Sequence, residues 1–264
     1  MLYRKVTPNP ETDQIVFVHI RKTAGTALAS VLFEALGAHP PHRTHWGSAE
    51  RAESGVLAIH GPLRRAAINL GEDLAILVRR ATGRPVHLAG DQAFFAAHMI
   101  LGTEPPSPRP KHYITVVRDP ADRFVSDHAF MAKKRDRARS DCLDHALYDL
   151  PLEDFVAAIE KAPEKYQHDY QCRQLAAGRP DADAARRAVD EKLWLAAPVP
   201  ELPAFMDRIA EALGRPLSPL PVTRATKGRA GLADLPEALV ARIRALNPGD
   251  AALVRHVTEE FHAL

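Results

Sequence analysis

Two short runs of apolar, β-branched residues stand out along the chain. Ile15–Ile20 reads IVFVHI, and Tyr113–Val117 reads YITVV. Such runs are typical of strands that a sheet buries on both faces. Each is followed by a polar turn and then by apolar residues at helical spacing, over 27–36 and from 120 onward. The pattern therefore predicts two strand–turn–helix units.

Weaker patterns predict the remaining elements. Short apolar runs predict strands at 56–59, 86–89 and 193–199, and periodic apolar positions predict helices over 63–81, 92–101, 152–159, 201–213, 235–246 and 250–261. Gly37 and Gly214 are expected to end the helices before them. Strands that alternate with helices predict an α/β fold with a parallel sheet flanked by helices. We expect one domain over residues 1–264.

The turn after the first run, Arg21–Thr26, reads RKTAGT. A small, basic turn between a buried strand and a helix predicts an anion site, because loop amides and the helix dipole converge on one point. Gly25 allows close approach of the backbone. Thr23 and Thr26 are expected to add hydroxyl donors, and Lys22 a positive charge. The turn lacks the Gly-Lys-Ser/Thr order of a Walker A loop.

The turn after the second run contains Arg118, Asp119 and Pro120. Asp119 is a favourable N-cap and Pro120 a favourable first helical residue. Helical spacing places Asp122 and Ser126 on one face of the helix, above the strand end that carries Arg118. The guanidinium group binds phosphate in a bidentate manner. Both turns follow parallel strands, so we expect them at the same edge of the sheet.

These two turns resemble the nucleotide motifs of sulfotransferases, particularly the group that contains the heparan sulfate 2-O-sulfotransferases and their bacterial members. His19–Ala27 reads HIRKTAGTA where that group commonly has H-I-P-K-T-A-G-T-S, so Arg21 replaces Pro and Ala27 replaces Ser. The second turn fills every fixed position of the motif R-D-P-x-x-R-x-x-S. The resemblance covers most of the chain and is specific at these two motifs.

The resemblance implies a P-loop-like sulfotransferase fold and binding of 3′-phosphoadenosine 5′-phosphosulfate (PAPS), with the desulfonated nucleotide PAP as product. It assigns the 5′-phosphosulfate to Arg21, Lys22, Thr23, Ala24, Gly25, Thr26 and Ala27. It assigns the 3′-phosphate to Arg118 and Ser126, and a basic loop that closes over the nucleotide to Lys227 and Arg229. Lys22 would stabilise the bridging oxygen as the bond between sulfur and that oxygen breaks.

Transfer to a hydroxyl also needs a base. Relatives often carry a His after a strand, but here the predicted strand at 86–89 is followed by Gly90 and Asp91. Asp91 is either the base or the N-cap of the predicted helix over 92–101. His60, after the predicted strand at 56–59, is a rival, and His98 is a third candidate. Asp119 and Asp122 are interpreted as capping and ion-pair residues.

Three other segments admit two interpretations each. The basic run 133–139 is either a solvated helix end or a dock for an anionic acceptor. Residues 166–178, which loosely match a family segment, either line the acceptor pocket or form a packed helix. His39, His42 and His45 fit no common zinc spacing, so we interpret their region as a loop and expect no metal site.

Composition narrows the class of protein. The net charge of +2 does not indicate a nucleic-acid or membrane partner. Cys142 and Cys172 make no disulfide framework, and no apolar run has the length of a signal peptide core or a membrane span. We therefore expect a cytoplasmic protein. The sequence does not indicate its oligomeric state.

The sequence thus predicts a PAPS-dependent sulfotransferase that modifies a hydroxyl or amine of a carbohydrate or another polar small molecule. Two alternatives stay open. One is an ATP-dependent phosphotransferase of kinase-like α/β fold, which magnesium-dependent turnover would favour. The other is a non-catalytic relative that binds the nucleotide without transferring a group.

Overall fold

The computed structural model describes residues 6–38, 77–78, 81–82, 91–133, 145–163, 166–221 and 231–264. Residues 77–78 and 81 are helical, in agreement with the end of the predicted helix over 63–81. The predicted strands at 56–59 and 86–89 lie outside the described residues.

Four strands form one parallel sheet: β1 (Gln14–Val18), β2 (Phe94–Ala97), β3 (Lys111–Val117) and β4 (Leu193–Pro198). Their order is β2-β1-β3-β4, and each neighbouring pair is parallel. All five residues of β1 are buried, as expected of a central strand. The fold class predicted from the sequence, α/β with a parallel sheet, is confirmed.

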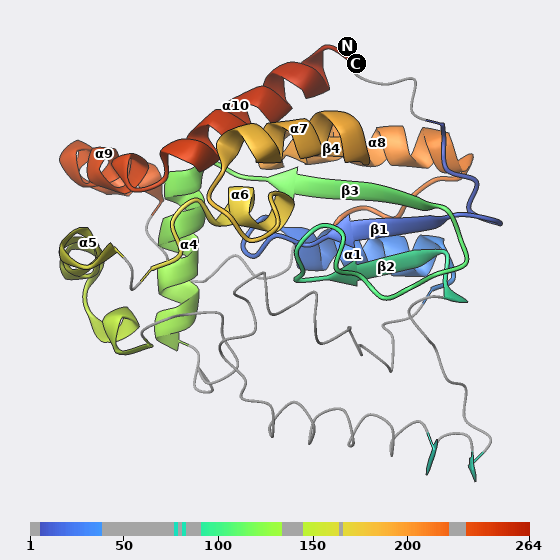
Figure 1. Cartoon of the computed structure of the whole chain (residues 1–264), viewed down its shortest axis with the longest axis horizontal. Coiled ribbons are helices and arrows are strands. Elements are labelled where there is room, and N and C mark those ends of the chain that lie inside the picture. The colour runs from blue at the N-terminus through green and yellow to red at the C-terminus, as the bar shows by residue number, and fades with distance from the viewer. Residues whose placement is uncertain are drawn as a thin grey trace.

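The strand order reverses at β1. The chain passes from β1 to β2 on one side of it and returns to the other side for β3 and β4. The carboxyl ends of β1 and β3 therefore border a topological switch point, where open α/β sheets bind their ligands. This edge lies at the left of the sheet in Figure 1, next to helix α4 (Pro120–Lys133).

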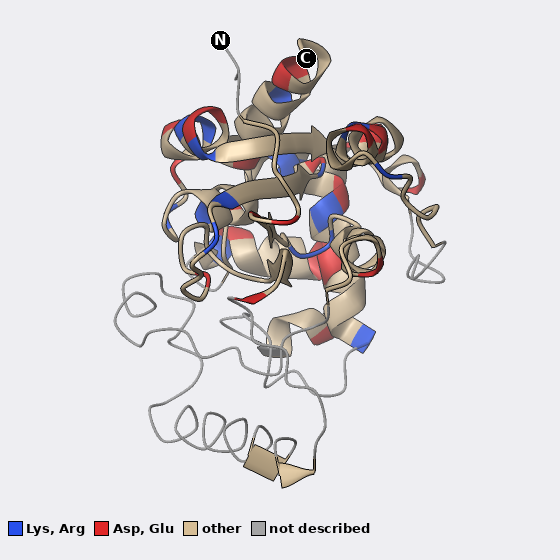
Figure 2. Ribbon diagram, turned by 90° about the vertical axis from the view of Figure 1, so that its right-hand side faces the viewer, with Lys and Arg blue, Asp and Glu red and all other residues tan. Residues whose placement is uncertain are grey.

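Helices cover both faces of the sheet (Figures 1 and 2). Helices α1 (Gly25–Ala35) and α8 (Leu202–Leu213) pack on one face in a core that contains Phe17 and Phe94. Helices α6 (Tyr170–Leu175), α7 (Ala182–Lys192) and α10 (Pro248–His262) pack on the other, against Val16 and Phe95. Burial of apolar side chains on both faces drives this layered arrangement.

A third core lies around α4 at the carboxyl edge of the sheet. It joins α4 to α5 (Leu152–Lys161), α9 (Glu237–Ala245) and the 3₁₀ turns η3 (His145–Asp149) and η6 (Leu232–Asp234). A further 3₁₀ turn, η5 (Val199–Glu201), connects β4 to α8. This side core fixes α4 beside the switch point.

One predicted element is wrong. The segment expected to be a helix over 92–101 contains strand β2 instead. Phe94 and Phe95 are buried in the cores on opposite faces of the sheet, the two-residue period of a strand. Helix α7 was not predicted. The helices predicted over 152–159, 201–213, 235–246 and 250–261 are confirmed within a few residues, and Gly214 ends α8 in the left-handed conformation.

Candidate functional site

The loop between β1 and α1 has an unusual backbone. Lys22 and Ala24 have φ angles of 70° and 63°, in the left-handed region that residues other than glycine rarely adopt. Strain of this kind persists where the surrounding structure imposes it, and it is often found at ligand sites. Alternating backbone conformations also turn successive N–H groups toward one side, which makes an anion-binding concavity.

The amino end of α1 is not capped by a side chain. Its N-cap residue, Ala24, makes no side-chain cap, and the first turn contains no acidic residue. Within the described residues, the amides of Thr23, Ala24, Gly25 and Thr26 have no acceptor. Four adjacent N–H groups at a helix N-terminus form a site for an anion. The amide of Ala27 lies outside this group, because it donates to the Ala24 carbonyl at 3.2 Å.

The backbone at Gly25 lies so close to the His19 side chain that only glycine fits there. A Cβ atom at this position would lie 2.1 Å from Cδ2 of His19. The start of α1 therefore passes against the His19 ring, and any larger residue would displace one of them.

Two predicted ligand side chains point inward. The Thr23 hydroxyl is buried and donates to the Ile20 carbonyl at 2.8 Å, so it stabilises the loop and is not available as a donor to a ligand. The Arg21 guanidinium pairs with buried Asp127 of α4 at 3.0 Å and lies over the Tyr170 ring. Each of these polar groups thus has an internal partner in this structure, and their contacts to a nucleotide stay predictions. Thr26 is exposed, as its predicted role requires.

Lys22, a residue of the β1–α1 loop, contacts Phe130 of α4 and Arg118 after β3. Its Nζ is 4.4 Å from the centre of the Phe130 ring, and its carbonyl accepts a hydrogen bond from Nη1 of Arg118 at 2.9 Å. This bond joins the two motifs that sequence analysis singled out. They meet at the switch point between β1 and β3.

Arg118 also binds Asp122, one turn along α4. Its Nε and Nη2 lie 2.7 and 2.6 Å from Oδ2 of Asp122. Asp119 caps α4, because its Oδ1 accepts from the Asp122 amide at 2.9 Å, and Pro120 is the first helical residue. The predicted capping and ion-pair roles of Asp119 and Asp122 are confirmed. Ser126 follows on α4 and is only 4% exposed.

Sequence analysis missed the residue that holds Arg118 in place. The Gln171 side chain accepts from the Arg118 amide and donates to its carbonyl, both at 2.9 Å. Gln171 belongs to the segment 166–178, which forms buried helix α6. Of its two interpretations, the packed helix is therefore the one observed.

A network of buried polar groups lies behind α6. Asp250 of α10 accepts from the amides of Gln171 and Cys172, and Asp169 accepts from the amide of Asp250. The carboxylates thus cap each other's helices. Arg123 of α4 is fully buried, with its Nε 4.0 Å from Asp250. Burial raises the pKa of Asp250, although Arg123 and the two amides act in the opposite direction.

The predicted base, Asp91, lies at the wrong edge of the sheet. It precedes β2, and β2 is parallel to β1, so Asp91 is near the amino ends of the strands. It borders a hollow of about 400 Å³ with Gly37 and Ala38, at the far end of α1 from the loop. Asp91 comes before β2 in the chain, whereas the base was expected after a strand at 86–89, which lies outside the described residues.

His98 lies at the carboxyl edge of the sheet. It follows β2 directly, at the same edge as the loop, and is exposed. Its Nδ1 is 2.7 Å from the His19 carbonyl and must donate to it, which leaves Nε2 of the neutral ring as a proton acceptor. The two imidazole centres are 4.0 Å apart. Burial, with a contribution from His98, lowers the pKa of His19 to about 3.

Three other predicted site residues lie outside the described residues: His60, Lys227 and Arg229. The same holds for His39, His42 and His45, and for the basic run 133–139 apart from Lys133. In the part of the chain that is described, no group of three His, Cys, Asp or Glu side chains is arranged as a metal site.

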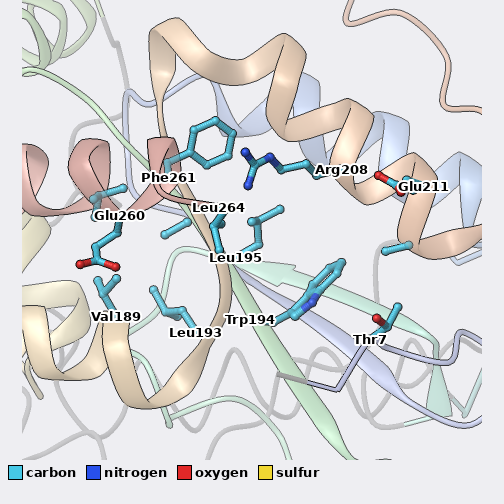
Figure 3. Close-up of a pocket in the computed structure, with 13 residues that line it drawn as sticks. Thr7, Val189, Leu193, Trp194, Leu195, Arg208, Glu211, Glu260, Phe261 and Leu264 are labelled. Atoms are coloured by element: carbon cyan, nitrogen blue, oxygen red, sulfur yellow. The ribbon is translucent and has the colours of Figure 1, made fainter. Parts of the chain in front are cut away.

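A second hollow, of about 430 Å³, lies beside β4 (Figure 3). Trp194, Arg208 and Phe261 are among its lining residues, and no residue of the β1–α1 loop borders it. Its contact with Leu193–Ala196 places it toward the amino end of the sheet. It is therefore separate from the switch point.

Comparison with known proteins adds no family. No protein-family model matches the chain, and no curated protein matches it as a relative. None of the helices that are described has the length and apolar character needed to cross a membrane.

Proposed function

We propose that this chain is a PAPS-dependent sulfotransferase with a sulfotransferase fold, which transfers the sulfuryl group to a hydroxyl or amine of a carbohydrate or another polar small molecule. One observation carries the proposal. Arg118 Nη1 bonds the Lys22 carbonyl at 2.9 Å, so the two nucleotide motifs meet beside four amides that have no acceptor among the described residues. A nucleotide with phosphates at two separated points matches this arrangement.

The amides of Thr23 to Thr26 hold the 5′-phosphate and the sulfonate oxygens in this proposal. Lys22 stabilises the negative charge on the leaving phosphate oxygen. Arg118 and Ser126 bind the 3′-phosphate, for which Arg118 exchanges part of its pairing with Asp122. Lys227 and Arg229 remain proposed contacts to the nucleotide. The protein thus contributes positioning and electrostatics, as in phosphoryl transfer.

We place His98 as the base in preference to Asp91. Nε2 of His98 takes the proton of the acceptor hydroxyl while the oxygen attacks sulfur. The bond between sulfur and the bridging oxygen breaks, and PAP leaves with the electron pair. Because Nδ1 of His98 donates to the His19 carbonyl, the ring has a fixed tautomer with Nε2 unprotonated.

One observation favours the phosphotransferase alternative. The Arg118 guanidinium is already paired with Asp122, as expected if no 3′-phosphate binds there. A transfer reaction that uses ATP and requires magnesium would support this alternative. A non-catalytic relative would bind PAP tightly and transfer nothing to any acceptor.

The experiment is transfer of radiolabelled sulfate from PAPS to a panel of polysaccharides, simple alcohols and amines. Lys22→Ala should lower the transfer rate much more than the affinity for PAP, because its charge acts mainly in the transition state. Arg118→Ala should weaken PAPS but barely affect adenosine 5′-phosphosulfate, which lacks the 3′-phosphate. Equal losses with both donors would contradict the assigned 3′-phosphate site.

The base is tested by a matched pair of variants. His98→Asn should lower the rate about 100-fold or more, the usual contribution of a general base. Asp91→Asn, at the opposite edge of the sheet, should keep full activity. The reverse result would return the role of base to Asp91.

A further inference from the structure

Phe130 is an exposed aromatic residue beside the candidate site. It lies on α4, and 37% of it is exposed. Phe130 is not among the buried residues of the core around α4. The face of its ring instead receives the Lys22 ammonium group, with Nζ 4.4 Å from the ring centre. This distance is within the range of a cation–π interaction.

The position of Phe130 on α4 links it to the second motif. Asp122, Ser126 and Phe130 are four residues apart in turn, so they lie along one stripe of the helix. Asp122, at the start of this stripe, binds Arg118, which in turn bonds the Lys22 backbone. Lys22 is thus held through its carbonyl at one end of the stripe and through its side chain at the other.

We propose that Phe130 is a positioning residue for Lys22, and that its ring holds the ammonium group beside the amides of the β1–α1 loop. A lysine side chain has four rotatable bonds and loses rotamer freedom when it is fixed. The negative face of the ring selects the charged end of the side chain and leaves N–H donors directed away from the ring. The role in sulfuryl transfer rests on the proposed function, but the contact itself does not.

The first test observes Lys22 without any ligand. In a protein labelled with ¹³C-lysine, the Lys22 Hε signals, assigned by their loss in Lys22→Met, should be shifted upfield from those of the other lysines by the ring current. Phe130→Leu keeps an apolar side chain without a ring, so the shift should disappear, and Phe130→Trp should restore it. Unshifted Lys22 signals in the wild type would overturn the proposal, whatever the protein binds.

The second test measures affinity for PAP and for inorganic pyrophosphate by calorimetry. Phe130→Leu should lower kcat about two- to fivefold with a smaller loss of PAP affinity, as expected of a residue that acts through Lys22, whereas Phe130→Trp should bind and turn over at least as well as wild type. The unfolding midpoint should not change, because the side chain is exposed. An unchanged kcat in Phe130→Leu would contradict the positioning role. A ring-current shift in a protein that binds pyrophosphate but not PAP would overturn the proposed function and retain the contact.

Discussion

Backbone amides at the starts of α6 and α10 donate to carboxylates, whereas those at the start of α1 have no acceptor among the described residues. At α6 and α10, Asp250 and Asp169 accept from helix amides, and both carboxylates are buried. At α1 the N-cap is Ala24, and no carboxylate stands in the first turn. Helix termini that serve structure are filled by the protein's own side chains. The difference agrees with the proposal that the start of α1 binds an external anion.

A substitution in the buried network of Asp169 and Asp250 should lower stability more than a substitution at the start of α1. Asp250→Ala removes the acceptor of two amides and leaves Arg123 without its nearby carboxylate, so we expect a loss of about 3–5 kcal/mol in the free energy of unfolding. Denaturant unfolding measures it. Asp183→Ala, at an exposed position on α7, is the control and should cost less than about 0.5 kcal/mol. Similar losses in the two variants would remove the contrast between the helix ends.

The open end of α1 can be converted into a capped one. Ala24→Asp introduces a carboxylate at an exposed N-cap whose left-handed backbone Asp tolerates. It should fill the free amides and repel the ligand, lowering affinity for PAP about 100-fold in calorimetry. Helix stability should rise by about 0.5–1 kcal/mol. Ala24→Asn, with the same shape and no charge, should keep most of the affinity; equal affinity in both variants would show that the amides do not bind the anion.

Gly25 at the start of α1 and Gly249 at the start of α10 allow these two helix ends to be compared directly. A Cβ at Gly25 would lie 2.1 Å from the His19 ring, and one at Gly249 would lie 2.9 Å from the Asp169 carboxyl group. Alanine at either position should cost about 1–3 kcal/mol of stability by overpacking. Only Gly25→Ala should also weaken PAP binding. A loss of binding in Gly249→Ala would mean that the buried network takes part in the anion site.

The smallest expected effect is a loss of folding stability at acidic pH. The pKa of His19 is about 3 in the folded protein, because the ring is buried, and about 6.5 when unfolded. The unfolded chain therefore binds more protons below pH 6.5, and stability falls as the pH decreases from 6.5 toward 3. At pH 5.5 the loss from His19 is about 1.4 kcal/mol. Wild type should thus lose more stability than His19→Phe between pH 7.5 and 5.5; parallel curves would contradict the assignment.

The central strands and the two motifs could be predicted because their signals are local. β1 and β3 are buried on both faces and read as apolar runs, while Asp119 and Pro120 mark the start of α4 within two residues. The order of the motifs along the chain, combined with parallel strands, was sufficient to place them at one edge.

Other features depend on partners far away in the sequence. Phe94–Ala97 has the composition of a helix or a strand, and only pairing with β1 decides between them. The same segment contains His98, whose place at the carboxyl end of β2 follows only from that pairing. Arg21 resembles a phosphate ligand by position, but its pairing with Asp127, 106 residues later, is invisible in the pattern. Gln171 likewise reveals its role only when α6 meets Arg118.

The central claim is that the loop after β1 and the strand end after β3 form one nucleotide site with separate places for two phosphate groups. Calorimetric titration with PAP and with ADP, without magnesium, tests it most directly. The account predicts that PAP binds and that ADP, which lacks the 3′-phosphate, binds at least about tenfold more weakly, the contribution of a charged hydrogen bond. ADP binding as tight as that of PAP would contradict the assignment of Arg118 and support the phosphotransferase alternative.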